Sequence, residues 1–246
     1  MKLGIVVPTY NEAVNIVLLL KALKKQALKM GDVTFLVAVV DDNSPDGTSK
    51  IANKLGKELS GSNFNVVVID RTEKDGYGKA CVRGMNYLLS KKVDFVLSMD
   101  ADLSHNPKYI KNFIAASKKH NLVIGSRYVH GGATPEWPLL RKILSRYGNY
   151  YARLFLNKGI SDYTGGFNLY SSKLLKEVDL NNIESTGYGF LIELKYKASN
   201  KAKSIYQVPI VFRDRQHGKS KIPKSTLIKN LFLVQKLKFS NSRVTY

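Results

Sequence analysis

Short apolar runs alternate with amphipathic stretches through the first half of the chain. The apolar runs show no alternation of polar and apolar positions, which is typical of strands buried on both faces. The stretches between them have the period of amphipathic helices. The expected strands cover residues 3–7, 33–40, 66–69, 95–99 and 122–124, and the expected helices 14–30, 48–59, 79–90 and 107–120. This order predicts an α/β domain whose mainly parallel sheet is covered by helices.

The second half of the chain is less regular and contains two basic amphipathic stretches. Residues 137–157 predict a helix with a broad apolar side and with Arg and Lys elsewhere on its surface. Residues 226–239 predict a second such helix, and its apolar core at 231–234 is too short to cross a bilayer. Helices of this kind can lie in a membrane interface. We therefore expect one main domain at 1–222 and a basic tail at 223–246 that contacts a membrane surface or a partner.

The charge balance indicates an anionic partner. The chain of 246 residues has 39 Lys and Arg against 19 Asp and Glu, a formal net charge of +20. This excess fits a phosphorylated ligand, an acidic lipid surface or a nucleic acid. The single cysteine, Cys81, excludes an intrachain disulfide and fits a reducing compartment. We expect no signal peptide, because a strand begins at residue 3, and no membrane span, because no apolar run approaches about 18 residues.

Two carboxylates follow an apolar strand in the run Asp100-Ala101-Asp102. Ligands of parallel sheets bind at the carboxyl ends of the strands. Carboxylates two residues apart can both face one divalent cation whose remaining positions are filled by phosphate oxygens. The run therefore indicates a metal and diphosphate site. The alternative, from these residues alone, is a solvated loop that caps the helix expected at 107.

Two further loops carry polar chemistry at the same edge. Asp41 and Asp42 follow the second expected strand and lead into a turn and a helix start at 43–48. Adjacent acids at the end of a buried strand are costly unless a cation, a hydroxyl or a base edge contacts them, and this makes Asp42 a candidate for nucleoside recognition. The loop at 8–12, taken alone, is explained by helix capping.

Together these segments resemble the dolichyl-phosphate mannosyltransferases, in one order from about residue 3 to 222. The matching segments are 8–12 (PTYNE), 41–48 (DDNSPDGT), 76–80 (GYGKA), 100–105 (DADLSH), 125–128 (GSRY), 131–132 (GG), Trp137, Arg141, Ser145, 148–149 (GN), 164–167 (TGGF), 187–188 (GY), Glu193, 214–215 (DR), Gly218, Ser220 and Lys221. Each segment is short, and the resemblance is specific because all the segments occur in the same order as in that family. It implies a GT-A fold, the Rossmann-like fold of family 2 nucleotide-diphospho-sugar transferases.

The resemblance also implies a donor site. The positions that match those holding the guanosine of GDP-mannose are Pro8, Tyr10, Glu12, Val40 and Asp42. The positions that match the metal and diphosphate loop are Asp100, Ala101 and Asp102, and the implied cofactor is Mg²⁺ or Mn²⁺. Many family members carry Gln where this chain has Ser104. A Ser hydroxyl reaches less far, so water can replace this third protein ligand.

The remaining implied residues hold phosphate. Basic positions for the donor and acceptor phosphates are matched by Arg127, Arg215 and Lys221, and positions near the acceptor lipid phosphate by Arg141 and Ser145. The implied acceptor is dolichyl or another polyprenyl phosphate. The resemblance places the enzyme peripherally on the cytoplasmic face of a membrane, the endoplasmic reticulum in a eukaryote or the plasma membrane in a prokaryote, where small membrane subunits can anchor it.

The implied reaction is one inverting displacement. A phosphate monoester has a second pKa of about 6, so the acceptor is already an anionic nucleophile at neutral pH and needs no general base. The catalytic residues are then Asp102, which with Asp100 holds the metal at the leaving diphosphate, and the basic set Arg127, Arg215 and Lys221, which neutralises phosphate charge.

Three other functions were compared with this one. A polyprenyl-phosphate glucosyltransferase that uses UDP-glucose shares the chemistry and stays open as the alternative. A nucleic-acid-binding module fits the net charge but leaves the acidic loops unexplained, so we expect no nucleic acid partner. A phosphate-loop hydrolase is suggested by Gly218-Lys219-Ser220, but Arg213 stands where that motif needs its first glycine.

Overall fold

The computed structural model describes residues 1–156, 159–214 and 226–241. Its centre is a seven-stranded sheet with the order β3-β2-β1-β4-β6-β5-β7. The strands are β1 (Lys2–Thr9), β2 (Thr34–Asp41), β3 (Phe64–Asp70), β4 (Phe95–Ser98), β5 (Leu122–Ser126), β6 (Asn168–Ser171) and β7 (Ile205–Pro209). Only β6 is antiparallel to its neighbours in this sheet. The expected α/β domain with a mainly parallel sheet is confirmed.

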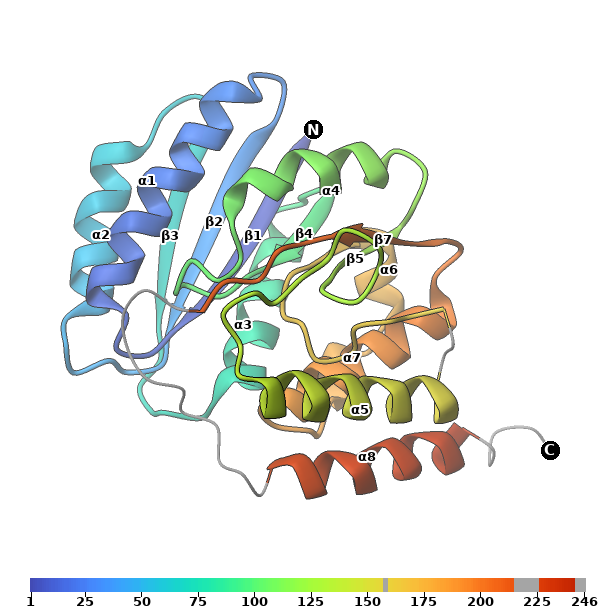
Figure 1. Ribbon diagram of the computed structural model, residues 1–246. Helices are drawn as coiled ribbons and strands as arrows, with labels where there is room; N and C mark the ends of the chain where they lie inside the picture. The colour runs from blue at the N-terminus through green and yellow to red at the C-terminus, as the bar shows by residue number, and fades with distance from the viewer. Residues whose placement is uncertain (157–158, 215–225, 242–246) are drawn as a thin grey trace.

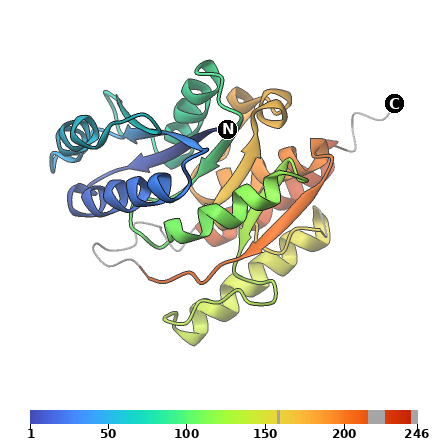
Figure 2. The ribbon, with the colours of Figure 1, turned by 90° about the horizontal axis from the view of Figure 1, so that it is seen from above.

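Helices cover both faces of the sheet. They are α1 (Ala13–Lys29), α2 (Thr48–Leu59), α3 (Tyr77–Ser90), α4 (Ile110–Ser117), α5 (Leu139–Phe155), α6 (Ser172–Glu177), α7 (Tyr188–Lys201) and α8 (Thr226–Asn241), with short 3₁₀ turns η1 (Pro107–Tyr109) and η2 (Leu180–Asn182). Figure 2 shows α1 and α4 on one face of the sheet and α3 and α6 on the other. Within the described ranges, no helix combines the length and apolar character that a bilayer span requires.

Each face of the sheet has its own hydrophobic core. Ile5 and Val7 of β1 belong to the core under α1 and α4, whereas Val6 belongs to the core under α3 and α7. Successive side chains of a strand point to opposite faces, so a continuous apolar run supplies both cores. On the second face α3 lies so close that a Cβ at Gly84 would come within 2.4 Å of Val6. The two cores fix the strand ends that carry the loops.

Sequence patterns located some elements better than others. The edge strand β3 was expected to be buried on both faces, and this was wrong, because it has a neighbour on one side only and of its residues Phe64 alone is buried. The short strands β6 and β7 and the helices α6 and α7 were not predicted. The two basic helices were predicted. They correspond to α5 and α8, which lie side by side at the bottom of Figure 1. Val234 and Leu237 attach α8 to the core under α5 and α7.

Candidate active site at the carboxyl ends of the strands

The loops that follow β1, β2 and β4 meet at one edge of the sheet, and each contains a residue in the left-handed region. These residues are Asn11 (φ 57°), Asn43 (φ 59°) and Leu103 (φ 63°). Asn tolerates this conformation because its side chain hydrogen-bonds locally, but for Leu it costs on the order of 1 kcal/mol. Leu103 stands directly between Asp102 and Ser104. The strain therefore lies in the loop predicted to hold the metal, where such strain is often functional.

The two adjacent acids at the end of β2, Asp41 and Asp42, have different partners. Asp41 accepts hydrogen bonds from the Thr9 hydroxyl at 2.8 Å and from the Ser44 hydroxyl at 2.7 Å. It therefore joins the first two loops. Asp42 is 4% exposed and forms an ion pair with Arg71, while the backbone N–H of Gly76 donates to it at 2.9 Å. Arg71 follows the end of β3 and was missed by the sequence analysis, which looked for the partner of Asp42 in a ligand.

The other residues predicted to hold the nucleoside lie around this junction. Tyr10 is partly exposed, with the Lys74 ammonium 3.8 Å from its ring centroid. Glu12 accepts a hydrogen bond from the Asn15 amide at 2.7 Å, and Pro8 is partly exposed at the end of β1. Val40 is 0% exposed, so its side chain belongs to the core and only its backbone could touch a ligand. Pro8, Tyr10, Glu12 and Asp42 thus surround one end of the candidate site.

Beyond the end of β4, Asp100 and Asp102 are held by two sets of donors. Asp100 accepts a hydrogen bond from the Tyr77 hydroxyl at 3.1 Å. Burial and the nearby Asp100 charge raise the pKa of Tyr77 well above its usual value, so this phenol remains a donor. Asp102, 6% exposed, accepts from the Ser104 hydroxyl at 2.6 Å and from the Ser104 backbone N–H at 3.1 Å. Ala101 between them is buried.

The Asp100 loop is further fixed by a histidine. The backbone N–H of Asp100 donates to His105 Nδ1 at 3.0 Å. The imidazole is 1% exposed and stacks on Phe167, with ring centroids 5.1 Å apart. Because Nδ1 accepts a hydrogen bond, this ring is a structural support for the loop and holds no proton there to give away.

The chemistry of this donor set fits Mg²⁺ or Mn²⁺. Both ions prefer oxygen ligands and usually take one or two carboxylates together with phosphate oxygens. A Cβ at Gly166 would lie 3.3 Å from an Asp100 carboxylate oxygen, so glycine keeps the space beside this group free of side chain. Across the described residues there is no cluster of three or more His, Cys, Asp and Glu suited to a metal. A cation here would therefore need ligand or water oxygens to complete its shell.

Arg127, predicted to hold phosphate, is the centre of a buried network. Its Nε donates to Asp162 at 2.7 Å and its Nη2 donates to the other carboxylate oxygen at 2.7 Å, the two-bond geometry that guanidinium and carboxylate favour. Nη2 also donates to the Thr164 hydroxyl at 2.8 Å. The side chains of Arg127 and Asp162 are 5% and 0% exposed. Much of the hydrogen-bonding capacity of this guanidinium is thus used inside the protein.

Lys195 is the third charged residue of the network around Arg127 and Asp162. This side chain is 0% exposed, and its ammonium donates to the backbone carbonyls of Asp162 at 2.7 Å and Gly165 at 2.6 Å. Burial lowers the pKa of Lys195 to about 7. Burial by itself would raise the pKa of Asp162, but the Arg127 guanidinium and then Lys195 outweigh it and lower the pKa to about 2. The result is a fixed loop over residues 162–166 whose last glycine borders Asp100.

The residues predicted to lie near the acceptor phosphate are on α5. Arg141 forms an ion pair with Asp214 at 2.8 Å and covers the Trp137 ring at 3.9 Å from its centroid. The Ser145 hydroxyl accepts a hydrogen bond from the Tyr128 hydroxyl at 2.6 Å. Arg215 and Lys221, also predicted to hold phosphate, lie outside the described residues.

The sequence analysis did not identify Asp162, Lys195 or Arg71, and it gave no role to Tyr77, which lies in the matched segment 76–80. Lys195 lies in helix α7, and a lysine in a helix is ordinarily exposed to solvent, so its sequence position gave no sign of burial. One usable signal was present for Asp162, since an acid three residues before a Gly-Gly pair is placed to cap that turn. The structure shows this contact, because the Gly165 N–H donates to Asp162 at 2.9 Å.

Comparison with known protein families gives a match over most of the chain. Residues 4–179 match the model of glycosyl transferase family 2. The chain is 38% identical over 222 residues to an undecaprenyl-phosphate mannosyltransferase of Micrococcus luteus, covering 90% of this chain and 88% of that protein. It is 36% identical over 231 residues to a polyprenol monophosphomannose synthase of Mycolicibacterium smegmatis, covering 94% and 84%.

Solved structures share the fold at lower identity. Mannosyl-3-phosphoglycerate synthase from Rubrobacter xylanophilus superposes with a TM-score of 0.66 at 18% identity, covering all of this chain and 76% of the other. A mannosyltransferase from Pyrobaculum calidifontis, solved with GDP-Man and Mn²⁺, superposes with a TM-score of 0.56 at 16% identity, covering 99% and 75%. At these identities the likeness concerns the fold.

Proposed function

Because the chain belongs to glycosyl transferase family 2 and has the GT-A fold, it is a glycosyltransferase, and we propose that it transfers mannose from GDP-mannose to a polyprenyl phosphate. Two relatives, 38% and 36% identical to this chain, are named for mannose transfer to undecaprenyl phosphate and for polyprenol monophosphomannose synthesis, and each is covered over more than four fifths of its length. The single structural observation behind the proposal is the buried, oriented Asp102 two residues after Asp100.

The proposed donor site extends from the loop after β1 to the loop after β4. Pro8, Tyr10 and Glu12 border the nucleoside, and Asp42, already neutralised by Arg71, supplies a fixed carboxylate beside it. A charge held in place before the ligand arrives needs little reorganisation when the ligand binds. Asp100 and Asp102 hold the divalent ion, which when bound neutralises charge on the leaving diphosphate.

The proposed acceptor site lies between α5 and the loop after β5. Arg141 faces the phosphate of the lipid, and Ser145 is turned by its hydrogen bond from Tyr128. Arg127 orients this region through its ion pair with Asp162, so we assign it a positioning role together with any phosphate contact it makes. The nucleophile is the acceptor phosphate itself, ionised at neutral pH, and no side chain needs to remove a proton. Arg215 and Lys221 complete the basic set in the proposal.

The place of the reaction follows from its acceptor. We propose that the chain works peripherally on a membrane that contains the polyprenyl phosphate, at its cytoplasmic face, with Mg²⁺ or Mn²⁺ as cofactor. Residues 1–222 form the catalytic domain in this proposal, and 223–246 contact the membrane or a small anchoring subunit. The packing of Val234 and Leu237 of α8 on the domain supports this part of the proposal.

A transfer assay with two donors and one substitution tests the proposal. Purified chain is incubated with polyprenyl phosphate and either GDP-mannose or UDP-glucose, with Mg²⁺, with Mn²⁺ or with a chelator. We expect mannosyl lipid from GDP-mannose only, and none with the chelator. Asp102→Ala should abolish transfer while the fold survives, because it removes a carboxylate the metal requires.

The matched control is Asp32→Ala, at an exposed turn before β2 and thus at the opposite edge of the sheet. It should transfer mannose as the unaltered chain does. If glucosyl lipid were the only product, the donor would be UDP-glucose and not GDP-mannose. Full activity of Asp102→Ala would show that the metal site is wrongly assigned.

A further inference from the structure

Residues 71–76, which connect β3 to α3 and which we call the β3–α3 segment, are held against Asp42 directly after β2. The Arg71 guanidinium pairs with this carboxylate, and the backbone N–H groups of Asp75 and Gly76 donate to it at 3.2 and 2.9 Å. Gly76 has φ 91°, a backbone region that other residues seldom adopt, so this turn depends on glycine. The segment is therefore fixed at its first residue and at its last two.

Residues 71–79 contain three cations, and one of them has a different kind of partner from the other two. Arg71 and Lys79 both pair with Asp75, at 3.1 and 2.8 Å. Lys74 pairs with no carboxylate among the described residues, and its ammonium lies 3.8 Å from the centroid of the Tyr10 ring. Lys74 is thus the cation of this segment whose charge is available to an incoming ligand.

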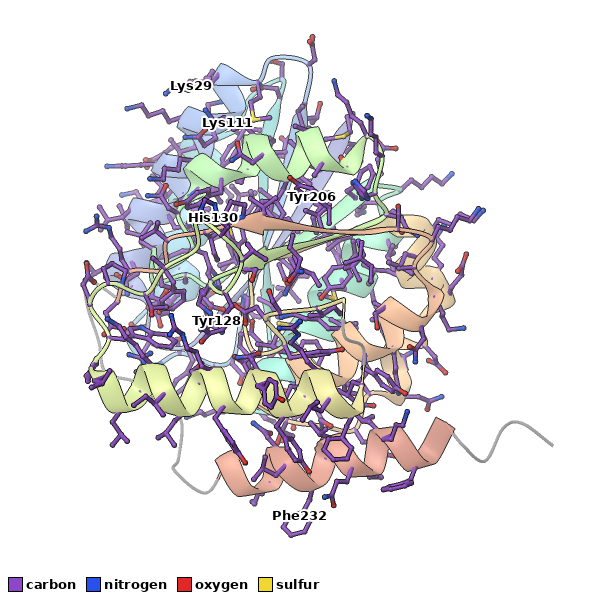
Figure 3. All side chains as sticks on the ribbon, turned by 45° about the vertical axis from the view of Figure 1, so that its right-hand side comes forward. Lys29, Lys111, Tyr128, His130, Tyr206 and Phe232 are labelled. Carbon is purple, nitrogen blue, oxygen red and sulfur yellow. The ribbon has the colours of Figure 1, made fainter. Side chains whose placement is uncertain are left out.

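An exposed lysine of this chain does not adopt such a position by default. Lys29 at the end of α1 and Lys111 on α4, both labelled in Figure 3, are also exposed, and neither lies over an aromatic ring of the described residues. Lys74 lies over Tyr10 because both ends of the β3–α3 segment are fixed. Tyr10 borders the nucleoside in the proposed function. The two side chains therefore form one surface at the nucleoside end of the proposed donor site.

Asp42 itself has little acceptor capacity left for a ligand. A carboxylate has about four acceptor positions, and the guanidinium and two backbone N–H groups of the β3–α3 segment already donate to this one. A carboxylate also has no hydrogen to donate to the acceptor atoms of a base. Recognition of those atoms needs a donor from another residue, and the Lys74 ammonium has three N–H groups.

Guanine and uracil differ in the acceptors that they present on one edge. Guanine presents O6 and N7 side by side, and a lysine ammonium can contact both. Uracil presents one carbonyl oxygen, O4, between a C–H group and an N–H group. An ammonium would therefore gain one contact fewer from uracil than from guanine, and the difference would favour a guanine nucleotide.

We propose that Lys74 donates to O6 and N7 of the guanine of the donor while the base stacks on Tyr10, which makes Lys74 a specificity-determining residue. When the base occupies the face of the Tyr10 ring, the ammonium moves from that face to the edge of the base, which the flexible four-carbon side chain of lysine allows. The hydrogen bonds are charge-assisted and so are stronger than neutral ones. The inference rests on the proposed function, since it takes GDP-mannose as the donor.

Titration calorimetry with nucleoside diphosphates tests Lys74 without acceptor or turnover. The full chain is titrated in Mg²⁺ with GDP, with UDP and with 7-deaza-GDP, in which a C–H group replaces N7. We expect GDP to bind more tightly than UDP, and 7-deaza-GDP to bind about tenfold more weakly than GDP, because one hydrogen bond to a charged donor is lost.

The variant Lys74→Met should lose this dependence on N7. Its affinity for GDP should fall on the order of tenfold and its affinity for UDP by less than about threefold, since GDP loses the larger number of hydrogen bonds. It should then bind GDP and 7-deaza-GDP within about twofold of each other, because no donor faces N7. Lys74 is exposed, so the thermal midpoint should stay within a few degrees of the unaltered chain and show that the variant folds.

The matched control is Lys91→Met. Lys91 is also an exposed lysine over a tyrosine, with its ammonium 5.2 Å from the Tyr87 ring centroid. It follows the last residue of α3, and its carbonyl accepts a hydrogen bond from the Lys2 ammonium at the start of β1, at the opposite edge of the sheet from the site. Because a distant exposed charge is screened, the control should keep the affinity for GDP within about twofold and keep the dependence on N7.

The possible outcomes separate this inference from the proposed function. If Lys74→Met weakened GDP and 7-deaza-GDP by the same factor, the ammonium would contact the ribose or the diphosphate, and the inference would be wrong. An unchanged affinity of Lys74→Met for GDP would also refute it, and in both cases a preference of the unaltered chain for GDP would leave the proposed donor standing. Tighter binding of UDP than of GDP by the unaltered chain would refute the proposed donor and the inference together.

Discussion

Replacing Asp162 by Asn should unfold the chain at a markedly lower temperature. Asn has nearly the shape of Asp, but it has no charge and offers one acceptor atom where the carboxylate has two. The carboxylate accepts from Arg127 Nε and Nη2 and from the backbone N–H groups of Arg127 and Gly165. In the variant, the buried guanidinium would face an amide N–H₂ group and lose its counter-charge.

The magnitude follows from burial. Removing one partner of a buried ion pair costs about 3–5 kcal/mol, because the remaining charge stays desolvated. In a chain of this length each kcal/mol lowers the unfolding midpoint by about 2–4 °C, so we expect a fall of about 6–20 °C. The control is Glu184→Gln, which breaks the Lys236–Glu184 pair whose side chains are 69% and 76% exposed. Water screens exposed ion pairs, so they add little to stability and this midpoint should move little.

The pH dependence of the unfolding free energy gives a second measure of what Asp162 contributes to stability. The pKa of Asp162 is lowered from 3.8 to about 2, which corresponds to about 2 kcal/mol of stability. A carboxyl with a lowered folded pKa contributes this stability above pH 3.8, and the contribution is lost as pH falls from 3.8 through 2. Calorimetry or urea unfolding from pH 6 down to 2 should therefore show a shallower loss of stability in Asp162→Asn than in the unaltered chain. Midpoints of the two proteins within about 2 °C at pH 7 would refute the reasoning.

Two further substitutions test other parts of the site. Lys195→Met should flatten the dependence of the unfolding free energy on pH between 7 and 9. With a pKa of about 7, Lys195 has lost its proton in the folded chain over this range, whereas the unfolded chain keeps it, so the unaltered chain gains up to about 2 kcal/mol of stability as pH rises. The same pH dependence of the unfolding free energy in both proteins, measured with urea, would contradict the assignment. Gly166→Ala should lower kcat/KM at least tenfold, since its Cβ would lie 2.9 Å from the Tyr77 hydroxyl and 3.3 Å from Asp100. Gly148→Ala, whose Cβ would meet nothing within 4 Å, is its control, and equal activity of the two variants would count against a crowded site.

The alternation of strands and helices in the first half, and the acidic loops that end two of these strands, could be predicted because both patterns are local in sequence. Continuous apolar runs such as 33–40 identify strands buried in a helix-covered sheet, and strand ends in such a sheet share an edge. That was enough to place Asp42, Asp100 and Asp102 at one edge of the sheet, and the metal expected at the last two stays a prediction. Whether a strand lies at the edge of a sheet depends on pairing with distant segments. The partial exposure of β3 could therefore not be predicted from its own Val and Ile residues.

The pairing of charges was decided by tertiary structure alone. Arg127, Asp162 and Lys195 come from a loop after β5, a loop before β6 and the middle of α7, and nothing in their spacing brings them together. From the sequence alone, Arg127 was interpreted as a phosphate ligand, because it is a basic residue in a family that binds phosphate. In the fold, two of the donor nitrogens of Arg127 are used by a buried carboxylate.

In the first half of the chain the sequence by itself determined which segments become strands and helices and which strands end in acids, because the periodicity of apolar side chains is a local pattern. Only the tertiary structure decided which charges pair with one another and which stay on the surface. The cost of burying an ion depends on every group around it, and those groups come from distant parts of the chain. Arg127 and Arg146 line the same cavity beside α5, yet Arg127 is buried in an ion pair with Asp162, whereas Arg146 is exposed.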